Sequence, residues 1–291
     1  MKIDCGTYPL MGGFDELLEG PGRPRNGADG LCDYFATLAP EELEALRFVE
    51  RRMQEYGFRT KILLHDAFIS LPGKASVLVD GDRAYSLGTA GHLFCFDAAT
   101  GQVLWSHDLR EAYRARVPTW GIAASPVIED DLLIVHFGGA DHACIGAFDK
   151  VTGVERWKAL PDDASYSAPI VITQAGKRVA VCWTGNRIVG LDSSSGRLLW
   201  EYPFPWEKWP IAIATPVLHR DLLLFSEAHQ GTLLLRLSQA EPSVEKVWHH
   251  RRENVGDGKA MHCLISTPQI DGDHIYGVDS GGVLRCLRLT T

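Results

Sequence analysis

A turn-and-tryptophan motif recurs along most of this 291-residue chain and restricts its fold more than any other feature. The motif is Asp-x-x-Ser/Thr-Gly, followed by a tryptophan eight residues after the aspartate. Its three clear copies are Asp97 to Gly101 with Trp105, Asp149 to Gly153 with Trp157, and Asp192 to Gly196 with Trp200. A degenerate fourth copy ends at Trp248, so consecutive tryptophans are 52, 43 and 48 residues apart.

A second signature recurs in phase with the first and marks the start of each repeat. A small residue and a proline open an apolar strand at Ser125-Pro126, Ala168-Pro169, Thr215-Pro216 and Thr267-Pro268, and a copy without the proline begins at Ser76. Each Asp-x-x-Thr-Gly is typical of a turn, because the carboxylate accepts backbone N–H groups and the glycine accepts positive φ. Single repeats of this length cannot bury both their faces, so they must stack. The pattern predicts an all-β propeller of about five four-stranded blades, with each tryptophan covering a seam between neighbouring blades.

These repeats resemble those of the PQQ-binding-like propeller family. The resemblance rests on "FCFDAATGQVLW", "GAFDKVTGVERW" and "VGLDSSSGRLLW" and covers roughly residues 75–289. It implies one of two functions, because some members are quinoprotein dehydrogenases and others, similar to the outer-membrane assembly lipoprotein, are non-catalytic scaffolds. Members are typically exported and usually have about seven or eight blades, whereas this chain shows four nearly complete blades and a partial fifth.

The first 60 residues differ from the repeats and form a predicted domain of their own, with the propeller assigned to residues 61–291. Leucine, valine and methionine at helical spacing predict an amphipathic helix over residues 37–57. "GGFDELLEGPGRPR" followed by "LAPEELEALRFVERRMQEYGF" resembles the opening of circularly permuted ATP-grasp-type proteins, although Asn26-Gly27 departs from that pattern. Nothing downstream supplies an ATP cleft.

Composition excludes several classes of function. The net charge is −8, from 29 Lys+Arg against 37 Asp+Glu, which gives no electrostatic basis for binding nucleic acid or an anionic membrane. No apolar run predicts a membrane span, and the N-terminus has no signal-peptide pattern. The sequence as it stands therefore indicates a cytoplasmic protein, whereas the family resemblance implies an exported one, and the compartment is left undecided. The seven cysteines form no CxxC pair, which disfavours a disulfide framework or a zinc site.

The chain lacks the motifs of common catalytic sites. It has no Walker loop, no Gly-x-Ser-x-Gly elbow and no His-Glu-x-x-His helix. No segment carries the calcium ligands, aspartate base or adjacent cysteine pair that the resemblance would require of a quinoprotein. A non-catalytic scaffold that binds a protein or a small ligand is therefore the first hypothesis, with no cofactor and no metal. A PQQ- and calcium-dependent alcohol or sugar dehydrogenase is the alternative.

One end of the predicted propeller gathers aromatic and polar side chains. The loops leaving the fourth strands and those joining the second and third strands share one face of a propeller, and loops on a rigid scaffold often bind ligands. The candidate ligand-binding residues on this face are Trp120, Asp141, His142, Tyr166, Trp183, Asn186, Trp209, Glu227, His229, His262 and Asp279. The alternative is that Trp120 and Trp209 fill the central channel and the polar groups are merely solvated.

The fifth repeat ends before any fourth strand, which leaves an open edge. Lys61 to Asp66 resembles the fourth strand of the first blade, with Leu64 in the tryptophan's place. One interpretation is that residues 61–66 pair beside Val283–Leu289 and close a five-bladed ring. The alternative is an incomplete, open arc of blades that self-associates through its bare edges.

Overall fold

The computed structural model describes residues 18–20, 23–24, 77–206, 212–251 and 260–289. The chain divides into two compact units, residues 1–67 with 98–101 and residues 68–97 with 102–291. In the first unit, β1 (Leu18–Gly20) pairs antiparallel with β2 (Arg23–Pro24). The helix predicted over residues 37–57, the domain boundary predicted at residue 60 and the strand predicted at 61–66 lie outside the described residues.

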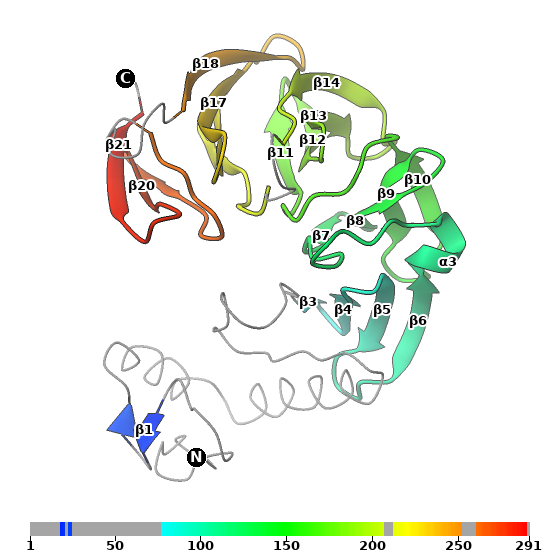
Figure 1. Cartoon of the computed structure of the whole chain (residues 1–291). Helices are drawn as coiled ribbons and strands as arrows, with labels where there is room; N and C mark the ends of the chain where they lie inside the picture. Colours follow the sequence, from blue (N-terminus) through cyan, green and yellow to red (C-terminus); the bar gives the residue numbers. More distant parts are fainter. Residues whose placement is uncertain (1–17, 21–22, 25–76, 207–211, 252–259, 290–291) are drawn as a thin grey trace. The chain divides into compact units, whose positions relative to one another are not determined.

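The second unit consists of five antiparallel sheets that follow one another along the chain (Figure 1). Blade 1 is β3 (Leu78–Asp80), β4 (Arg83–Leu87), β5 (His92–Asp97) and β6 (Val103–Asp108). Blade 2 is β7 (Val127–Glu129), β8 (Leu132–Gly139), β9 (Ala143–Asp149) and β10 (Glu155–Ala159). Blade 3 is β11 (Ile170–Gln174), β12 (Lys177–Trp183), β13 (Arg187–Asp192) and β14 (Leu198–Pro203). Blade 4 is β15 (Val217–His219), β16 (Leu222–Glu227), β17 (Gly231–Leu237) and β18 (Val244–His250), and blade 5 is β19 (Gln269–Asp271), β20 (His274–Val278) and β21 (Leu284–Arg288).

In every blade the strands pair in chain order, so each blade is an antiparallel meander. This confirms the all-β architecture of propeller-like sheets. Blade 5 has three strands in the described part of the chain. A short helix that the sequence pattern did not predict, α3 (Leu109–Tyr113), follows β6; the Asp108 carboxylate caps it by accepting the backbone N–H groups of Arg110 and Glu111 at 3.0 and 3.1 Å.

The repeated aspartates form the turns between third and fourth strands. One carboxylate oxygen of Asp149 accepts the backbone N–H of Val151 and of Thr152 and the Thr152 hydroxyl, at 3.1, 2.8 and 2.9 Å. The ion pair with Arg156 and these hydrogen bonds lower the pKa of Asp149. Asp192 holds its turn in the same way through Ser194 and Ser195.

Each repeat tryptophan lies on a fourth strand and is linked to the next blade. The indole N–H groups of Trp105, Trp157 and Trp248 donate to the backbone carbonyls of Lys150, Ser193 and Leu289, at 3.2, 3.0 and 2.9 Å. These three carbonyls occupy one equivalent position, just after the third strand of the following blade. Trp157 and Trp200 are buried, and Trp105 and Trp248 are half-buried.

The seam between blades 3 and 4 is built differently. Trp200 donates to the side-chain oxygen of Gln174 in its own blade at 2.8 Å. The Gln174 amide then donates to the backbone carbonyls of Ser238 and Ser243 in blade 4, at 3.2 and 2.7 Å. A buried glutamine therefore relays the link that a direct bond provides elsewhere.

The apolar core lies between the blades. Separate buried clusters join blades 1 and 2, 2 and 3, 3 and 4, and 4 and 5. The five described cysteines are free, and Cys95, Cys144, Cys182 and Cys263 are buried among these clusters, whereas Cys286 is exposed. Among the described residues, no helix is long and apolar enough to cross a membrane.

Candidate binding face

The loop face is the surface formed by the hairpins between second and third strands and the exit loops after fourth strands. In the described part it comprises residues 88–91, 109–126, 140–142, 160–169, 184–186, 204–206, 212–216, 228–230, 260–268 and 279–283. Each exit loop is hydrogen-bonded to the hairpin or second strand of the next blade. Arg116 N–H donates to Gly138, Gly185 N–H to Asp163, and Ser280 N–H to His262, all at backbone carbonyls and at 3.2, 2.9 and 2.6 Å. The loops of neighbouring blades therefore form one connected surface.

Trp120 and Tyr166 meet on this face. Their ring centroids are 5.7 Å apart, and the backbone N–H of Trp120 donates to the Tyr166 hydroxyl at 3.3 Å. Tyr166 is buried, and Trp120 is half-buried. Burial raises the pKa of Tyr166, so its phenol stays protonated at neutral pH.

Asp141 and His142 lie at the tip of the blade 2 hairpin. Both are exposed and have positive φ, of 55° and 62°. Asp141 forms an ion pair with Arg114 of the preceding exit loop.

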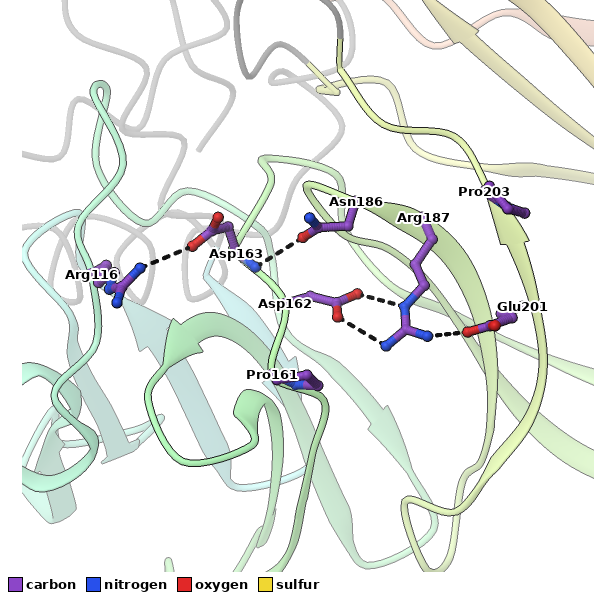
Figure 2. Close-up of a pocket in the computed structure, with 8 residues that line it drawn as sticks. All are labelled: Arg116, Pro161, Asp162, Asp163, Asn186, Arg187, Glu201 and Pro203. Atoms are coloured by element: carbon purple, nitrogen blue, oxygen red, sulfur yellow. Dashed lines mark hydrogen bonds and ion pairs between the residues drawn. The ribbon is translucent and has the colours of Figure 1, made fainter.

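An open groove of about 440 Å³ lies where the exit loop of blade 2 meets blade 3 (Figure 2). Six of its eight lining residues are charged or carry an amide: Arg116, Asp162, Asp163, Asn186, Arg187 and Glu201, with Pro161 and Pro203 completing the wall. Asn186 is the candidate residue that lines this groove, and its side-chain oxygen accepts the backbone N–H of Asp163 at 3.2 Å.

A buried ion pair forms one wall of the groove. The guanidinium of Arg187 donates two hydrogen bonds, both of 2.9 Å, to the two oxygens of Asp162 (Figure 2). Asp162 is buried and also accepts the Thr184 hydroxyl at 2.7 Å, while Arg187 reaches Glu201 on its other side. The bonds to Asp162 raise the pKa of Arg187 above its usual value. Both partners are thereby fixed in the wall.

The rim of the groove is more exposed than its wall. Arg116 lies 3.7 Å from Asp163, with side chains 83% and 51% exposed. An exposed pair at this distance contributes little to stability. Arg116, Asp163, Asn186 and Glu201 therefore offer donors and acceptors of both signs to a molecule lying across the groove.

Several other candidate residues are part of the scaffold of the face. Trp183 is 2% exposed and packs against Phe204 and Phe225 between blades 3 and 4. The Glu227 carboxylate is buried and accepts the backbone N–H groups of His229 and Gln230 at 2.8 and 2.5 Å, which shapes the blade 4 hairpin.

His262 and Asp279 connect blades 4 and 5. His262 is buried, and its Nδ1 lies 2.9 Å from the Ala228 carbonyl oxygen. Asp279 is buried, forms an ion pair with Arg285 at 2.6 Å and accepts the Gly281 N–H at 2.9 Å. Trp209 lies outside the described residues. The structure thus brings Trp120 to Tyr166 and His262 to the hairpin of Glu227 and His229, and it keeps Asp141 and His142 at a separate tip.

Sequence reasoning missed most of the groove. Arg116, Asp162, Asp163, Arg187 and Glu201 were not among the candidates. The available signal was the pair of adjacent carboxylates in Pro161-Asp162-Asp163, in the exit loop of blade 2. A second hint was Arg187, which directly follows the hairpin between the second and third strands of blade 3.

Residues 55–291 match the protein family described as outer membrane protein assembly factor BamB, a PQQ-type family. This chain belongs to that family. The family match begins near the end of the segment that resembles an ATP-grasp opening, so the comparisons give that second resemblance no support.

One curated relative and two solved structures show how far the similarity extends. Polyvinylalcohol dehydrogenase of Sphingopyxis sp. (strain 113P3) is 28% identical over 44% of this chain and 22% of its own length. BamB from Moraxella catarrhalis superimposes with a TM-score of 0.54 at 17% identity, covering 74% of this chain and 60% of that one. The C-terminal WD40 domain of Sif2 gives a TM-score of 0.50 at 12% identity, over 74% and 55%. The chain therefore spans about a fifth of the first protein and three fifths of the second, and the two structures show the fold alone.

The described residues do not fit a calcium-bound quinone. Calcium takes six to eight oxygen ligands, several of them carboxylates. Within residues 77–206, 212–251 and 260–289, no three His, Cys, Asp or Glu side chains come close enough to hold a metal ion together. The buried carboxylates of the loop face, in Asp162, Glu227 and Asp279, are already engaged by arginines, a threonine hydroxyl and backbone N–H groups.

Proposed function

We propose that this chain is a non-catalytic propeller scaffold that binds an extended segment of a partner protein across the groove on its loop face. The carrying observation is the contrast between the two parts of the groove. Its wall is fixed by the buried Asp162–Arg187 pair, while Arg116, Asp163, Asn186 and Glu201 expose polar groups at its rim. A rigid wall with a charged rim suits the recognition of a partner by complementary charges.

The shape and chemistry of the groove favour a protein segment over a small molecule. Sites for small ligands are enclosed and mostly apolar, whereas six of the eight residues here are polar and the groove is open. The family description, an outer membrane protein assembly factor, supports a protein partner as well. Trp120, Asp141, His142 and His229 extend the proposed binding surface beyond the groove over the neighbouring loops.

Selection from a displayed peptide library tests this proposal. Selected peptides are labelled, and their affinities for wild type and for Arg116→Glu are measured by fluorescence anisotropy. We expect Arg116→Glu to weaken binding about tenfold or more, because it places a like charge opposite the carboxylates of any peptide that pairs with Arg116. Arg197→Glu is the matched control, because Arg197 is exposed at the opposite end of blade 3.

Equal affinities for wild type and Arg116→Glu would contradict the proposal, as would an equal loss in Arg197→Glu. The first result would remove the groove from the binding site. The second would show that binding responds to overall charge and not to this surface.

A quinone-dependent dehydrogenase is the second candidate function. It is favoured by one observation, the 28% identity with polyvinylalcohol dehydrogenase. The alignment covers 22% of that protein. The metal-binding side chains of the described loop face do not support a calcium-bound quinone there.

A further inference from the structure

The groove on the loop face carries different charges at its two ends. Figure 2 shows Arg116 at one end, next to Asp163, and Glu201 at the other end, next to Arg187. All eight lining residues fall within residues 77–206, which the structure describes without a gap. The order of these charges can therefore be followed from one end of the groove to the other.

The Glu201 end carries a carboxylate that its arginine cannot fully neutralise. Arg187 donates two hydrogen bonds of 2.9 Å to Asp162 and reaches Glu201 with its remaining terminal nitrogen. One cation is thus shared by two carboxylates, and this end keeps a net negative charge. Asp162 is buried in the wall, whereas the Glu201 side chain is 48% exposed. The negative charge is therefore presented to a partner at Glu201.

The Arg116 end carries a cation that is held only loosely. Arg116 Nη1 lies 3.7 Å from the Asp163 carboxylate, which is longer than a hydrogen bond, and the arginine side chain is 83% exposed. The backbone of Arg116 is fixed, since its N–H donates to the Gly138 carbonyl at 3.2 Å. An anchored backbone with an exposed guanidinium, which has five N–H donors, suits the binding of a carboxylate.

Between the two ends, Asn186 provides a neutral donor. Its side-chain oxygen accepts the backbone N–H of Asp163 at 3.2 Å, so the NH₂ group is the end of the amide that can donate along the groove. An extended peptide has backbone carbonyls between its side chains, and each of them needs a donor. The middle of the groove therefore suits peptide backbone, and its two ends suit charged side chains.

A similar set of charges in blade 4 shows what is particular to the groove. Arg236 also lies between two carboxylates, Asp221 and Glu245, at 3.5 and 3.1 Å, but its side chain is 48% exposed. Arg187 is 23% exposed and makes two hydrogen bonds to one buried carboxylate. Of the two sets, the one in the groove is the more rigid, and charges that are already in place cost less to order when a partner binds.

We propose that the groove recognises a partner segment with a basic residue opposite Glu201 and an acidic residue opposite Arg116, and that it thereby selects the direction in which the segment lies. This inference rests on the proposed function and deepens it. A segment that lies the other way brings its base to Arg116 and its acid to Glu201, where like charges repel. The net charge of the chain, −8, adds a general attraction for the base.

Double-mutant cycles with peptides selected on the groove test the proposal. Fluorescence anisotropy gives the affinities of wild type, Arg116→Gln and Glu201→Gln for a selected peptide and for versions with a neutral analogue of its acid or its base. We expect loss of the base to weaken binding at least about threefold in wild type and hardly at all in Glu201→Gln. Loss of the acid should behave in the same way toward Arg116→Gln. The crossed combinations should be additive, and they serve as internal controls.

A peptide in which the acid and the base exchange places tests direction. We expect wild type to bind it at least about tenfold more weakly than the original, since both pairs then become like charges. Glu245→Gln is the matched control, because Glu245 also pairs with a shared arginine but at the end of blade 4 away from the loop face. This variant should keep the wild-type affinities. Circular dichroism melting checks that each variant is folded.

Three results would overturn the inference. Peptides that need the groove but bind equally well with exchanged charges would show that it does not select direction, and the proposed function would stand. Coupling as large in the crossed combinations as in the matched ones would show a diffuse effect of charge, and it would also leave the proposed function in place. A library that yields no peptide sensitive to Arg116→Glu would overturn both proposals together.

Discussion

Gly196 shows how a single residue serves two purposes in this repeat. Its φ is +70°, which a side chain rarely adopts, and a Cβ atom there would lie 2.5 Å from the Trp157 ring of the preceding blade. Gly153 has the same relation to Trp105, with 2.7 Å. The glycine of each of these two motif copies is therefore needed both for the turn and for the seating of the neighbouring tryptophan.

Replacing glycine by alanine at two positions separates these effects. Gly176 also has a positive φ, of +72°, but a Cβ there meets nothing within 4 Å. We expect Gly176→Ala to lower the free energy of unfolding by about 1–2 kcal/mol through backbone strain alone. Gly196→Ala should lose about 1–3 kcal/mol more, because the methyl group overpacks against Trp157. Urea denaturation measures both, and equal losses would show that the tryptophan contact is unimportant.

His136 makes stability depend on pH. It is fully buried in blade 2, where its Nε2 accepts the backbone N–H of Ser165 at 3.3 Å and its Nδ1 lies 3.4 Å from the Ser167 carbonyl. Burial lowers the pKa of this imidazole from 6.5 to about 4. Between these values the unfolded chain binds a proton that the native protein does not, so acid favours unfolding.

We expect the contribution of His136 to stability to be complete above about pH 6.5 and to be lost as pH falls toward 4. The loss amounts to about 3 kcal/mol for a shift of this size. Urea denaturation of His136→Gln at several pH values should show a shallower pH dependence than wild type. His142→Asn, at an exposed histidine, should keep the wild-type dependence. A wild-type slope in His136→Gln would contradict the assignment.

Among the structural elements, the exit loops determine what the molecule presents to a partner. The exit loop of blade 2 is held to blade 3 by the backbone bond from Gly185 to Asp163 and by the Asp162–Arg187 pair. Breaking a buried pair by removing one partner leaves an uncompensated charge, which is costly. The stability of the groove therefore depends more on Arg187 in its wall than on the exposed residues of its rim.

Arg187→Met tests this dependence. The substitution leaves the carboxylate of Asp162 buried and without its bidentate partner, and we expect a loss of about 3–5 kcal/mol in the free energy of unfolding. Arg236→Met is the comparison, because Arg236 is half-exposed in its pairs with Asp221 and Glu245, and it should cost less than about 1 kcal/mol. Chemical denaturation gives both values, and similar losses would mean that the Arg187 pair behaves like a surface pair.

The sequence pattern predicted the strands and turns well because the determinants of a turn are local. Asp149, Thr152 and Gly153 lie within five residues and form their hydrogen bonds among themselves. The groove could not be predicted in this way, since Arg116, Asp163 and Glu201 meet only after three blades have stacked. The same holds for Trp183 and Asp279, whose loops were foreseen but whose burial depends on the neighbouring blade. The role of Gln174 in the seam between blades 3 and 4 was not predicted, because it depends on one side chain that belongs to no repeated motif.

At the scale of the whole molecule, stacking is what the sequence predicts most securely, and chemistry is what it predicts least. The repeat period alone implies sheets that must cover one another, and the family match is consistent with that repeat. BamB from Moraxella catarrhalis shares this fold, but a propeller can support scaffolds and enzymes alike. The residues of the loop face, and not the fold, must therefore distinguish a scaffold from an enzyme.

A quinone-dependent activity would be read out directly by an oxidation assay. With pyrroloquinoline quinone and calcium added, we expect the purified chain to show no dye-linked oxidation of alcohols, polyvinyl alcohol or aldose sugars. The reason lies in the residues of the described loop face, where Asp162, Glu227 and Asp279 are engaged by internal partners and no three metal-binding side chains converge. A calcium-bound quinone would have to displace these contacts, several of them buried.

A quinone-dependent dehydrogenase assayed in parallel confirms that the cofactor and the dye are active. Fluorescence titration of the chain with pyrroloquinoline quinone separates binding from turnover: a chain that binds the quinone without oxidising substrate keeps the scaffold assignment. Saturable dye reduction that requires both quinone and calcium would overturn it. Such activity would also imply that residues outside the described part of the loop face supply the ligands, since those within it are already committed to holding the loops together.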